Sequence, residues 1–516
     1  MPAPPVAAPP PSSTHMTART ARWIGIATFL CFALTGGGRI VGSDEVTMLG
    51  LGQALLHGGI AVPTGATLDG PDGRHYTKNA AGQAVIALPL VAAAEAAAAR
   101  LPLPESRRAL AVRFVVSFFN GLITALLLAT FYRTVRALGV RARPALAATL
   151  MLGLTTPIWV YAKSFMAEPL QALGLLLALA GSLRAAGGVE RGAWWAGLGV
   201  LIAVSAKLSM LPLALMCLWP LRGARAQAWR AALAMLALAL AGHGLYNQAR
   251  FGTPFETGYG AQASPSAYRT PFLVGLYGLL LSSGKGIAWF APALWWAPAG
   301  WRAMRRAGGS HARAAVSVAL ASTFALLLYA KFEHWAGDGS FGPRYLVPLL
   351  PLAFVPVAFA LGEATGLRKA LAIGLAVAGL AAQLGGVAIY FGAQMREAGD
   401  YPYRLPLSDP HFMSESHFDP HDSPIAGHWR MLARNAGEHL AGRWPNLSGQ
   451  GEVDARVGLS AQDQQALLHA LDFWWLYAGY AGAPTVPLQA AAALLAAFGI
   501  AFLVRAPGAA RAERSS

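Results

Sequence analysis

Charged residues are scarce in this sequence, and cysteine is almost absent. Of 516 residues only 12% are charged, whereas 55% are hydrophobic, and the mean hydropathy is +0.45. The two cysteines, Cys31 and Cys217, lie inside apolar runs, so they indicate two core thiols and not a disulfide framework. So little charge, combined with apolar runs of about 20 residues, indicates a polytopic membrane protein.

Acidic residues are fewer than basic ones, with 24 Asp and Glu against 40 Lys and Arg, which leaves a net charge of +16. In a soluble protein this excess would suggest a nucleic-acid partner. Here the arginines gather in short loops between apolar runs, as at Arg133, Arg136, Arg141 and Arg143. Short arginine-rich loops face the cytoplasm. The charge therefore indicates topology, and we expect no nucleic-acid partner.

We expect an all-α polytopic membrane protein with about 12 transmembrane helices (roughly 11–13), because helices satisfy their own backbone polar groups in lipid. The candidate spans are residues 22–40, 110–132, 144–163, 168–184, 193–209, 210–220, 229–247, 286–301, 312–330, 344–362, 369–391 and 484–505.

The apolar run 80–99 is long enough to cross a membrane but is assigned differently. Cytoplasmic arginines before the first span and after the second require an even number of spans between them. The runs 22–40 and 110–132 already supply two. We therefore expect 80–99 to lie along, or dip into, the outer leaflet, which Pro89 and Glu95 make easier than a full crossing.

This topology places both termini in the cytoplasm and divides the chain into four parts. These are a Pro/Ala-rich, disordered N-terminus (1–20), a transmembrane domain (21–391) whose first outer loop is 41–109, an outer loop region (392–483), and a last span with a cytoplasmic tail (484–516).

Titratable residues near the ends of the spans gather on the predicted outer side. They are Asp44, Glu45, Lys78, Arg113, Lys163, Glu168, Lys207, Arg250, Glu256, Lys285, Glu333, His334, Asp338 and Arg344. Charges near the ends of membrane spans are functional candidates. A transporter would place some of them at mid-membrane, so clustering at one face favours a site that opens to one side.

The segment 43–78 holds the strongest candidate. Asp44 and Glu45 follow the first span directly, which on local grounds is also typical of an ordinary helix N-terminus. A short mixed helix, a Gly/Asp-rich loop and the run from His75 to Lys78 come next. The order of these features, more than any one of them, indicates function.

The run from Asp44 to Pro89 is similar to the first outer loop of membrane glycosyltransferases with the GT-C fold. It resembles in particular the lipid A aminoarabinose transferase and protein O-mannosyltransferase families. An Asp-Glu pair after span one, a helix ending near Gly59 to Pro63, and Tyr76 to Lys78 before an apolar helix carry the resemblance. Asn79-Ala80 stands where those families have a proline after the lysine.

The resemblance continues at low identity over residues 20–390. Arg113 opens span two, Glu168 in FMAEPL stands where such enzymes usually have Asp, and Lys207 in SAKLSM matches a lysine at the outer end of span five. The runs 246–260, 279–294 and 334–351 resemble uncharacterised bacterial members of the superfamily.

The resemblance implies an inverting glycosyltransferase that moves a monosaccharide from a polyprenyl-phosphate donor to a glycan, lipid or protein acceptor. Its site would face the periplasm from a bacterial cytoplasmic membrane. The implied catalytic residues are Asp44, Glu45 and Glu168; the implied phosphate-binding residues are Lys78, Lys207, Arg344 and Arg113; the implied substrate-binding residues are His75, Tyr76, Tyr259, Glu333 and His334. A divalent cation, Mg²⁺ or Mn²⁺, is left open at Asp44 and Glu168, and no other cofactor is expected.

The chemistry of such a donor needs few protein groups. A polyprenyl phosphate is a stable leaving group once a cation neutralises it, so no general acid is required. The acceptor hydroxyl or amine is a weak nucleophile and needs a base aligned with C1 of the sugar. Asp44 fits the base, and Lys78 fits the phosphate partner.

Two other functions stay open at this point. A translocator of lipid-linked sugars would bind the same donor without chemistry, and a non-catalytic subunit of an envelope complex would need no common cavity. Two further motifs receive ordinary interpretations: SSGKG (282–286) as a turn, since a phosphate loop needs other spacing, and the His-rich run 411–428 as a solvated loop.

Overall fold

A computed structural model describes residues 11–63, 65–222, 224–447 and 460–512. In the first part of the chain lie α1 (Pro11–Thr35), α2 (Ser43–Leu56), β1 (Thr67–Asp69), β2 (His75–Thr77), α3 (Gly82–Ala99), α4 (Glu105–Val116), α5 (Phe119–Ala137), α6 (Ala142–Leu154), α7 (Ile158–Ala162), α8 (Glu168–Ala186) and α9 (Arg191–Ala206).

The middle part contains η1 (Leu208–Met210), α10 (Leu211–Cys217), η2 (Trp219–Leu221), α11 (Ala226–Phe251), η3 (Gly260–Ala263), η4 (Pro265–Ala267), α12 (Phe272–Leu281), α13 (Ile287–Phe290), η5 (Pro292–Trp296), α14 (Ala297–Ala307) and α15 (Gly309–Lys331). The last part contains η6 (Arg344–Leu349), α16 (Leu350–Glu363), α17 (Gly366–Ala388), α18 (Phe391–Glu397), α19 (Ser414–Phe418), α20 (Pro424–Leu440), α21 (Ala461–Leu468), α22 (Trp474–Tyr480) and α23 (Thr485–Ala512). The η elements are 3₁₀ helices.

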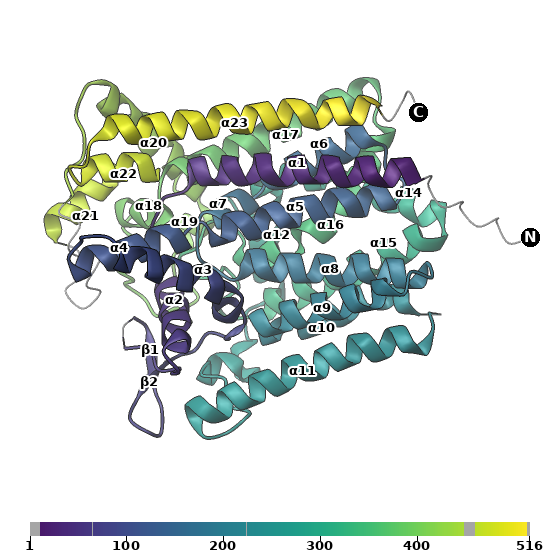
Figure 1. The fold of residues 1–516 in the computed structure, drawn as a ribbon, viewed down its shortest axis with the longest axis horizontal. Helices are drawn as coiled ribbons and strands as arrows, with labels where there is room; N and C mark the ends of the chain where they lie inside the picture. Colours follow the sequence, from purple (N-terminus) through teal and green to yellow (C-terminus); the bar gives the residue numbers. More distant parts are fainter. Residues whose placement is uncertain (1–10, 64, 223, 448–459, 513–516) are drawn as a thin grey trace, which may run out of the picture.

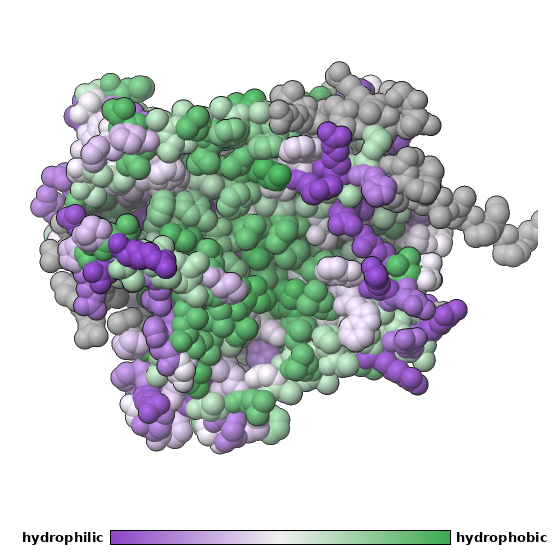
Figure 2. Space-filling model, in the orientation of Figure 1, coloured by the Kyte–Doolittle hydropathy of each residue, from purple (hydrophilic) through white to green (hydrophobic). Residues whose placement is uncertain are grey.

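The long helices run side by side along the horizontal axis of Figure 1. The start of α1, the end of α23 and α14 lie at the right-hand end, whereas α2, α4 and α20 to α22 lie at the left (Figure 1). Hydrophobic residues cover the middle of the same view, and hydrophilic residues gather toward its two ends (Figure 2). This belt is what a protein surrounded by lipid requires. The described parts of the predicted segments 41–109 and 392–483 share one end of the molecule (Figure 1).

Each predicted span coincides with helical structure, but several are divided. The span predicted at 144–163 is α6 and α7 with a break before Pro157, and the span at 286–301 is α13, η5 and α14. Proline cannot donate to the helical ladder, so helices restart at such residues. By length and composition, eight helical segments of the described residues could cross a membrane. The fold is all-α as expected, while the count of about 12 crossings stays a prediction.

Two segments differ from expectation in their limits. α1 begins at Pro11, ten residues before the predicted start of the transmembrane domain at residue 21. Proline is tolerated in the first turn of a helix, so Pro11 can stand at this position. Residues 1–10, part of the predicted disordered N-terminus, lie outside the described residues. The run 80–99 forms α3, which packs against α2 and α4 and has exposed Val85 and Ile86. α3 is long enough to cross a membrane, so its place in the outer leaflet remains a prediction.

The described residues contain one β-hairpin, β1 with β2, paired in antiparallel register from Thr67 opposite Thr77. The Tyr76 hydroxyl donates to Asp72 in the turn at 2.6 Å. A side chain at Gly70 would lie 2.4 Å from the Tyr76 ring and 2.7 Å from the carbonyl oxygen of Arg250. The hairpin is thus pressed against the end of α11, which fixes the chain that leads to Lys78.

Small residues let α8 and α9 approach closely. A Cβ atom at Gly181 would lie 2.2 Å from the backbone nitrogen of Ala196, and one at Gly199 would lie 2.2 Å from that of Ala178. Contacts between small residues are typical of helix pairs in membranes. This contact matters for the site, since α8 begins at Glu168 and α9 ends next to Lys207.

Gly181→Leu should push α8 away from α9 and lower stability by about 1–3 kcal/mol, the usual cost of overpacking. Gly242→Leu is the matched control, because Gly242 lies in α11 with no atom within 4 Å of a built Cβ. Thermal unfolding in detergent measures both. Equal stability of the two variants would show that the α8–α9 contact does not limit stability.

Candidate active site

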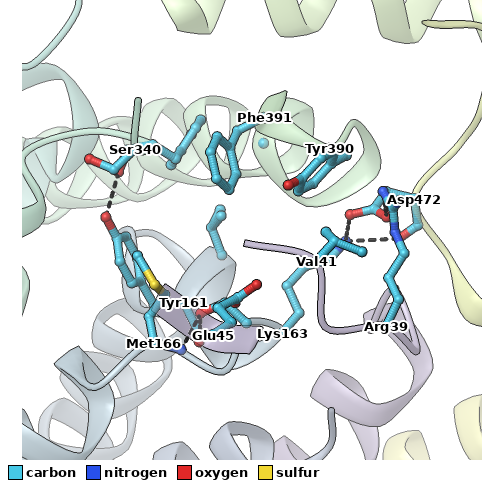
Figure 3. A pocket seen from close by; sticks show the side chains of 15 residues that line it. Arg39, Val41, Glu45, Tyr161, Lys163, Met166, Ser340, Tyr390, Phe391 and Asp472 are labelled. Atoms are coloured by element: carbon cyan, nitrogen blue, oxygen red, sulfur yellow. Dashed lines mark hydrogen bonds and ion pairs between the residues drawn. The ribbon is translucent and has the colours of Figure 1, made fainter. Parts of the chain in front are cut away.

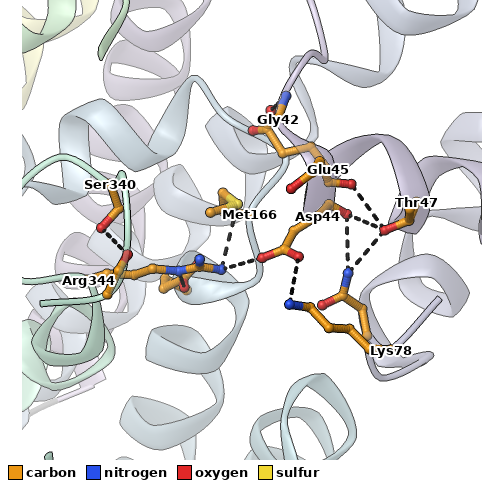
Figure 4. Close-up of polar contacts among 12 residues, drawn as sticks. Gly42, Asp44, Glu45, Thr47, Lys78, Met166, Ser340 and Arg344 are labelled. Atoms are coloured by element: carbon orange, nitrogen blue, oxygen red, sulfur yellow. Dashed lines mark hydrogen bonds and ion pairs between the residues drawn. The ribbon is translucent and has the colours of Figure 1, made fainter. Parts of the chain in front are cut away.

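Five charged residues that are far apart in the sequence line one pocket. Asp44 lies in the first turn of α2, Lys78 follows β2, Glu168 opens α8, Lys207 follows α9, and Arg344 opens η6. All five were predicted as site residues. Figure 4 shows Asp44 with Arg344 on one side and Lys78 on the other. The structure thus brings these five residues into one cavity, while the role of each residue stays a prediction.

Arg344 joins two carboxylates of the pocket, those of Asp44 and Glu168. Its Nη2 lies 3.1 Å from Oδ2 of Asp44, and its Nε lies 2.5 Å from Oε1 of Glu168. The side chains of Arg344 and Glu168 are 15% and 4% exposed, so both charges are largely removed from water. Charge-assisted hydrogen bonds from one rigid guanidinium fix both acids in place.

Asp44 also faces Lys78, whose Nζ lies 4.0 Å from Oδ1. Burial raises the pKa of Asp44, but the charges of Arg344 and Lys78 outweigh it and hold the pKa below its usual value. The carboxylate is therefore ionised at neutral pH and able to accept a proton.

Glu45 has a different environment from its neighbour. Its two carboxylate oxygens accept hydrogen bonds from the backbone N–H groups of Phe165, at 2.6 Å, and Gly42, at 2.8 Å. Burial raises the pKa of Glu45, against the effect of these amides. Glu45 thus ties the start of α2 to the loop before α8. This geometry favours a structural role over the predicted catalytic one.

Neutral polar side chains complete the pocket. They are Asn79, Gln171, Tyr259 and Gln262, with Tyr345 and the carboxylate of Asp338 at the edge. Asn79 donates to Thr47 Oγ1 at 3.2 Å, which links it to α2. The second carboxylate oxygen of Glu168 is buried and has no hydrogen-bond partner among the described residues. Amides, a phenol and an unused carboxylate oxygen suit the hydroxyl groups of a sugar.

A second cavity shares six residues with this pocket: Lys78, Ala80, Lys207, Tyr259, Gln262 and Tyr345. Away from Asp44 it continues between aromatic and apolar residues of α15, including Leu328 and Tyr329, and Phe332 directly after that helix. Buried Arg250 lies in its wall, donates to the carbonyl oxygen of Thr77 and to Asn247 Oδ1, and is 2% exposed. The cavity is thus cationic near Asp44 and aromatic further away.

A third cavity is lined by Glu45 together with Tyr161, Ser340 and Phe391 among others (Figure 3). Asp472 enters it from the C-terminal region and accepts from Lys163 Nζ at 2.8 Å and Arg39 Nη2 at 3.1 Å. Burial raises the pKa of Asp472, but these two cations outweigh it and lower the pKa. This buried triad fastens the outer loop region to the membrane helices.

Five predicted site residues lie away from the Asp44 pocket: Arg113, His75, Tyr76, Glu333 and His334. Arg113 lines another cavity beside α22. His75 pairs with Asp69 on the exposed hairpin, and Tyr76 bonds within the same hairpin. Glu333 pairs with Arg269 at 3.0 Å and lies 3.3 Å from His334. Among the described residues, the contacts of these five side chains lie outside the Asp44 pocket, so their positions do not support the predicted roles.

Sequence reasoning missed Gln171, Gln262 and Tyr345 as pocket residues. Gln171 follows Glu168 by three positions on a helix, a spacing that places both on one face. That periodicity could have identified it. Gln262 lies in the short 3₁₀ helix η3, for which the sequence carries no comparable pattern.

The divalent cation that the sequence leaves open at Asp44 and Glu168 does not fit this arrangement. The guanidinium of Arg344 lies between Asp44 and Glu168, where a metal ion bound by both would lie. The described residues contain no group of three His, Cys, Asp or Glu residues that could hold a metal ion. A metal ion at this point would be repelled by the guanidinium of Arg344.

No protein-family model and no curated protein matches this sequence. Among solved structures, ArnT from Cupriavidus metallidurans bound to undecaprenyl phosphate aligns with a TM-score of 0.51 and 15% identity, over 90% of this chain and 78% of that one. The apo oligosaccharyltransferase of Archaeoglobus fulgidus aligns with a TM-score of 0.41 and 12% identity, over 81% and 63%. The likeness to ArnT confirms the predicted GT-C fold, and the chain is a multi-pass membrane protein.

Arg344→Met should destabilise the protein by about 3–5 kcal/mol, since it leaves the buried Glu168 carboxylate without its partner and Asp44 with Lys78 alone. The double variant Arg344→Met/Glu168→Leu should recover part of that loss, because it removes one of the stranded charges. The free energy of unfolding is measured for the wild type, for the single variants Arg344→Met and Glu168→Leu, and for the double variant. Additive effects of the two changes would show that Arg344 and Glu168 do not act as a pair.

Proposed function

We propose that this protein is an inverting glycosyltransferase that takes a monosaccharide from a polyprenyl-phosphate donor. The observation that carries the proposal is the pocket of Asp44, in which one carboxylate base faces the cations Lys78 and Arg344 beside Lys207. A GT-C fold holds this pocket. The acceptor would be a glycan, lipid or protein, reached at the outer face of the cytoplasmic membrane.

The donor would lie across the two connected cavities. Its phosphate would bind at Lys78 and Lys207, which line both. Its polyprenyl chain would follow the aromatic and apolar side chains of α15 toward the lipid. Its sugar would lie over Gln171 and Gln262, next to Asp44. The undecaprenyl phosphate bound to ArnT supports a ligand of this class in this fold.

The transfer then needs one proton acceptor. The acceptor hydroxyl or amine attacks C1 of the sugar and forms the new C1–O or C1–N bond, while the bond from C1 to the phosphate oxygen breaks with its electron pair. The released polyprenyl phosphate remains neutralised by Lys78 and Lys207, and Asp44 accepts the proton of the attacking group. Attack opposite the leaving phosphate inverts the configuration at C1.

Binding of the donor would also activate the base. In the free pocket Lys78 and Arg344 both attract the Asp44 carboxylate and lower its pKa. A donor phosphate at Lys78 competes for that attraction, which leaves Asp44 less stabilised and more basic. Arg344 keeps its contact with Glu168 and holds the carboxylate in position.

Asp44→Asn should lower donor turnover by roughly 10²- to 10⁴-fold, the usual contribution of a general base, while the melting temperature changes little. Turnover is measured as release of polyprenyl phosphate from a panel of polyprenyl-phosphate sugars by the purified protein. Asp69→Asn makes the same chemical change on the exposed hairpin and should keep full activity.

Wild-type turnover by the Asp44→Asn variant would disprove the role of the base. Movement of the donor across vesicle membranes without release of polyprenyl phosphate, in both wild type and variant, would instead identify a translocator.

A further inference from the structure

The turn SSGKG buries a lysine outside the pocket of Asp44. Lys285 is 1% exposed, and its backbone N–H donates to Ser282 Oγ at 3.2 Å, which holds the turn between α12 and α13. Its ammonium donates to the carbonyl oxygens of Asp338, at 3.0 Å, and Ser340, at 2.6 Å, with Ser340 Oγ at 3.4 Å. A buried ammonium has three N–H groups, and here three oxygens of one loop surround it.

That loop, residues 337–343, leads directly into Arg344. Three of its residues, Gly337, Asp338 and Gly342, have φ values of 71°, 56° and 65° in the left-handed region. Asp338 is costly there because it carries a Cβ. The loop also turns back on itself, since a Cβ at Gly337 would lie 2.8 Å from Cβ of Arg344. Such a conformation persists only when contacts from outside hold it.

The turn around Lys285 also meets the outer loop region. The N–H of Gly284 donates to the carbonyl oxygen of His417 at 3.0 Å. A Cβ at Gly284 would lie 2.0 Å from the carbonyl oxygen of Ser416, so only glycine allows this approach. Ser416 Oγ donates in turn to Asp400 at 2.5 Å. The SSGKG turn thus lies between the outer region and the loop that carries Arg344.

We propose that Lys285 is a positioning residue, which holds loop 337–343 so that Arg344 stays between Asp44 and Glu168. This role rests on the proposed function for its effect on turnover, but its effect on the loop is independent of any activity. Lys285 touches neither carboxylate, and it acts through the carbonyl oxygens of Asp338 and Ser340. It also couples the α19 segment of the outer region to the pocket.

Hydrogen exchange of the purified protein tests the effect on the loop. Loss of hydrogen bonds from a charged donor should speed exchange of the Ser340 and Arg344 amides by roughly 10- to 100-fold in Lys285→Met. Lys163→Met is the matched control, because Lys163 is also a buried lysine. It should speed exchange at 470–474, next to its partner Asp472, and leave 337–344 unchanged.

Donor turnover tests the consequence for the pocket. Lys285→Met should lower kcat by about 10²-fold, as small misplacements of catalytic groups do, with a much smaller change in KM for the donor. Lys285→Gln, which still donates two hydrogen bonds, should give intermediate exchange and turnover, and it replaces the methionine variant if that fails to fold.

The two proposals fail in different ways. Unchanged exchange of 337–344 in both Lys285 variants would overturn the positioning role, whatever the activity. Absence of donor turnover by the wild-type protein would overturn the proposed function, while the exchange result would still decide the role of Lys285.

Discussion

The guanidinium of Arg344 between Asp44 and Glu168 is the contact on which the arrangement of the pocket depends. It joins residues separated by 300 and 176 positions in the sequence, and it neutralises carboxylates that burial would otherwise penalise. Without the guanidinium, α2 and α8 would bring the carboxyl groups of Asp44 and Glu168 together in a largely buried pocket with no cation between them. With it, Asp44 remains ionised and both acids are fixed in direction.

Backbone packing places the atoms that this contact needs. Glycines bring α8 and α9 close enough for Glu168 and Lys207 to open into the same pocket. The hairpin, pressed against α11, delivers Lys78 from the other side. The pocket then contains three cations and three carboxylates, counting Lys207 and Asp338. Because these charges balance, a phosphate that enters would be attracted most by Lys78 and Lys207, the two cations that also line the second cavity.

The sequence predicted the helical fold. It also predicted that one side of the membrane holds Asp44, Lys78, Glu168, Lys207 and Arg344. Hydrophobic length and arginine placement suffice for that, since both follow from the bilayer as solvent. Side-chain direction does not follow from them. His75 and Tyr76 lie within three positions of Lys78, yet they bond inside the hairpin.

The sequence also did not predict which loops contact one another. The turn SSGKG was predicted correctly as a turn, but nothing in its sequence indicates that Lys285 would meet the carbonyl oxygens of a loop more than 50 positions later. Such contacts depend on how distant loops meet, which local patterns do not encode.

Asp44 and Glu45 differ by one position on a helix and therefore have different partners. Both lie in the first turn of α2, and neighbouring side chains on a helix point about 100° apart. Glu45 therefore turns toward the backbone amides of Gly42 and Phe165, which use both of its oxygens. Asp44 turns toward cations that a phosphate can also bind. A carboxylate held by amides of the protein backbone keeps these partners when a ligand binds, whereas a phosphate can compete with Asp44 for Lys78. Of two acids that the sequence treats alike, the geometry thus favours Asp44 as the base.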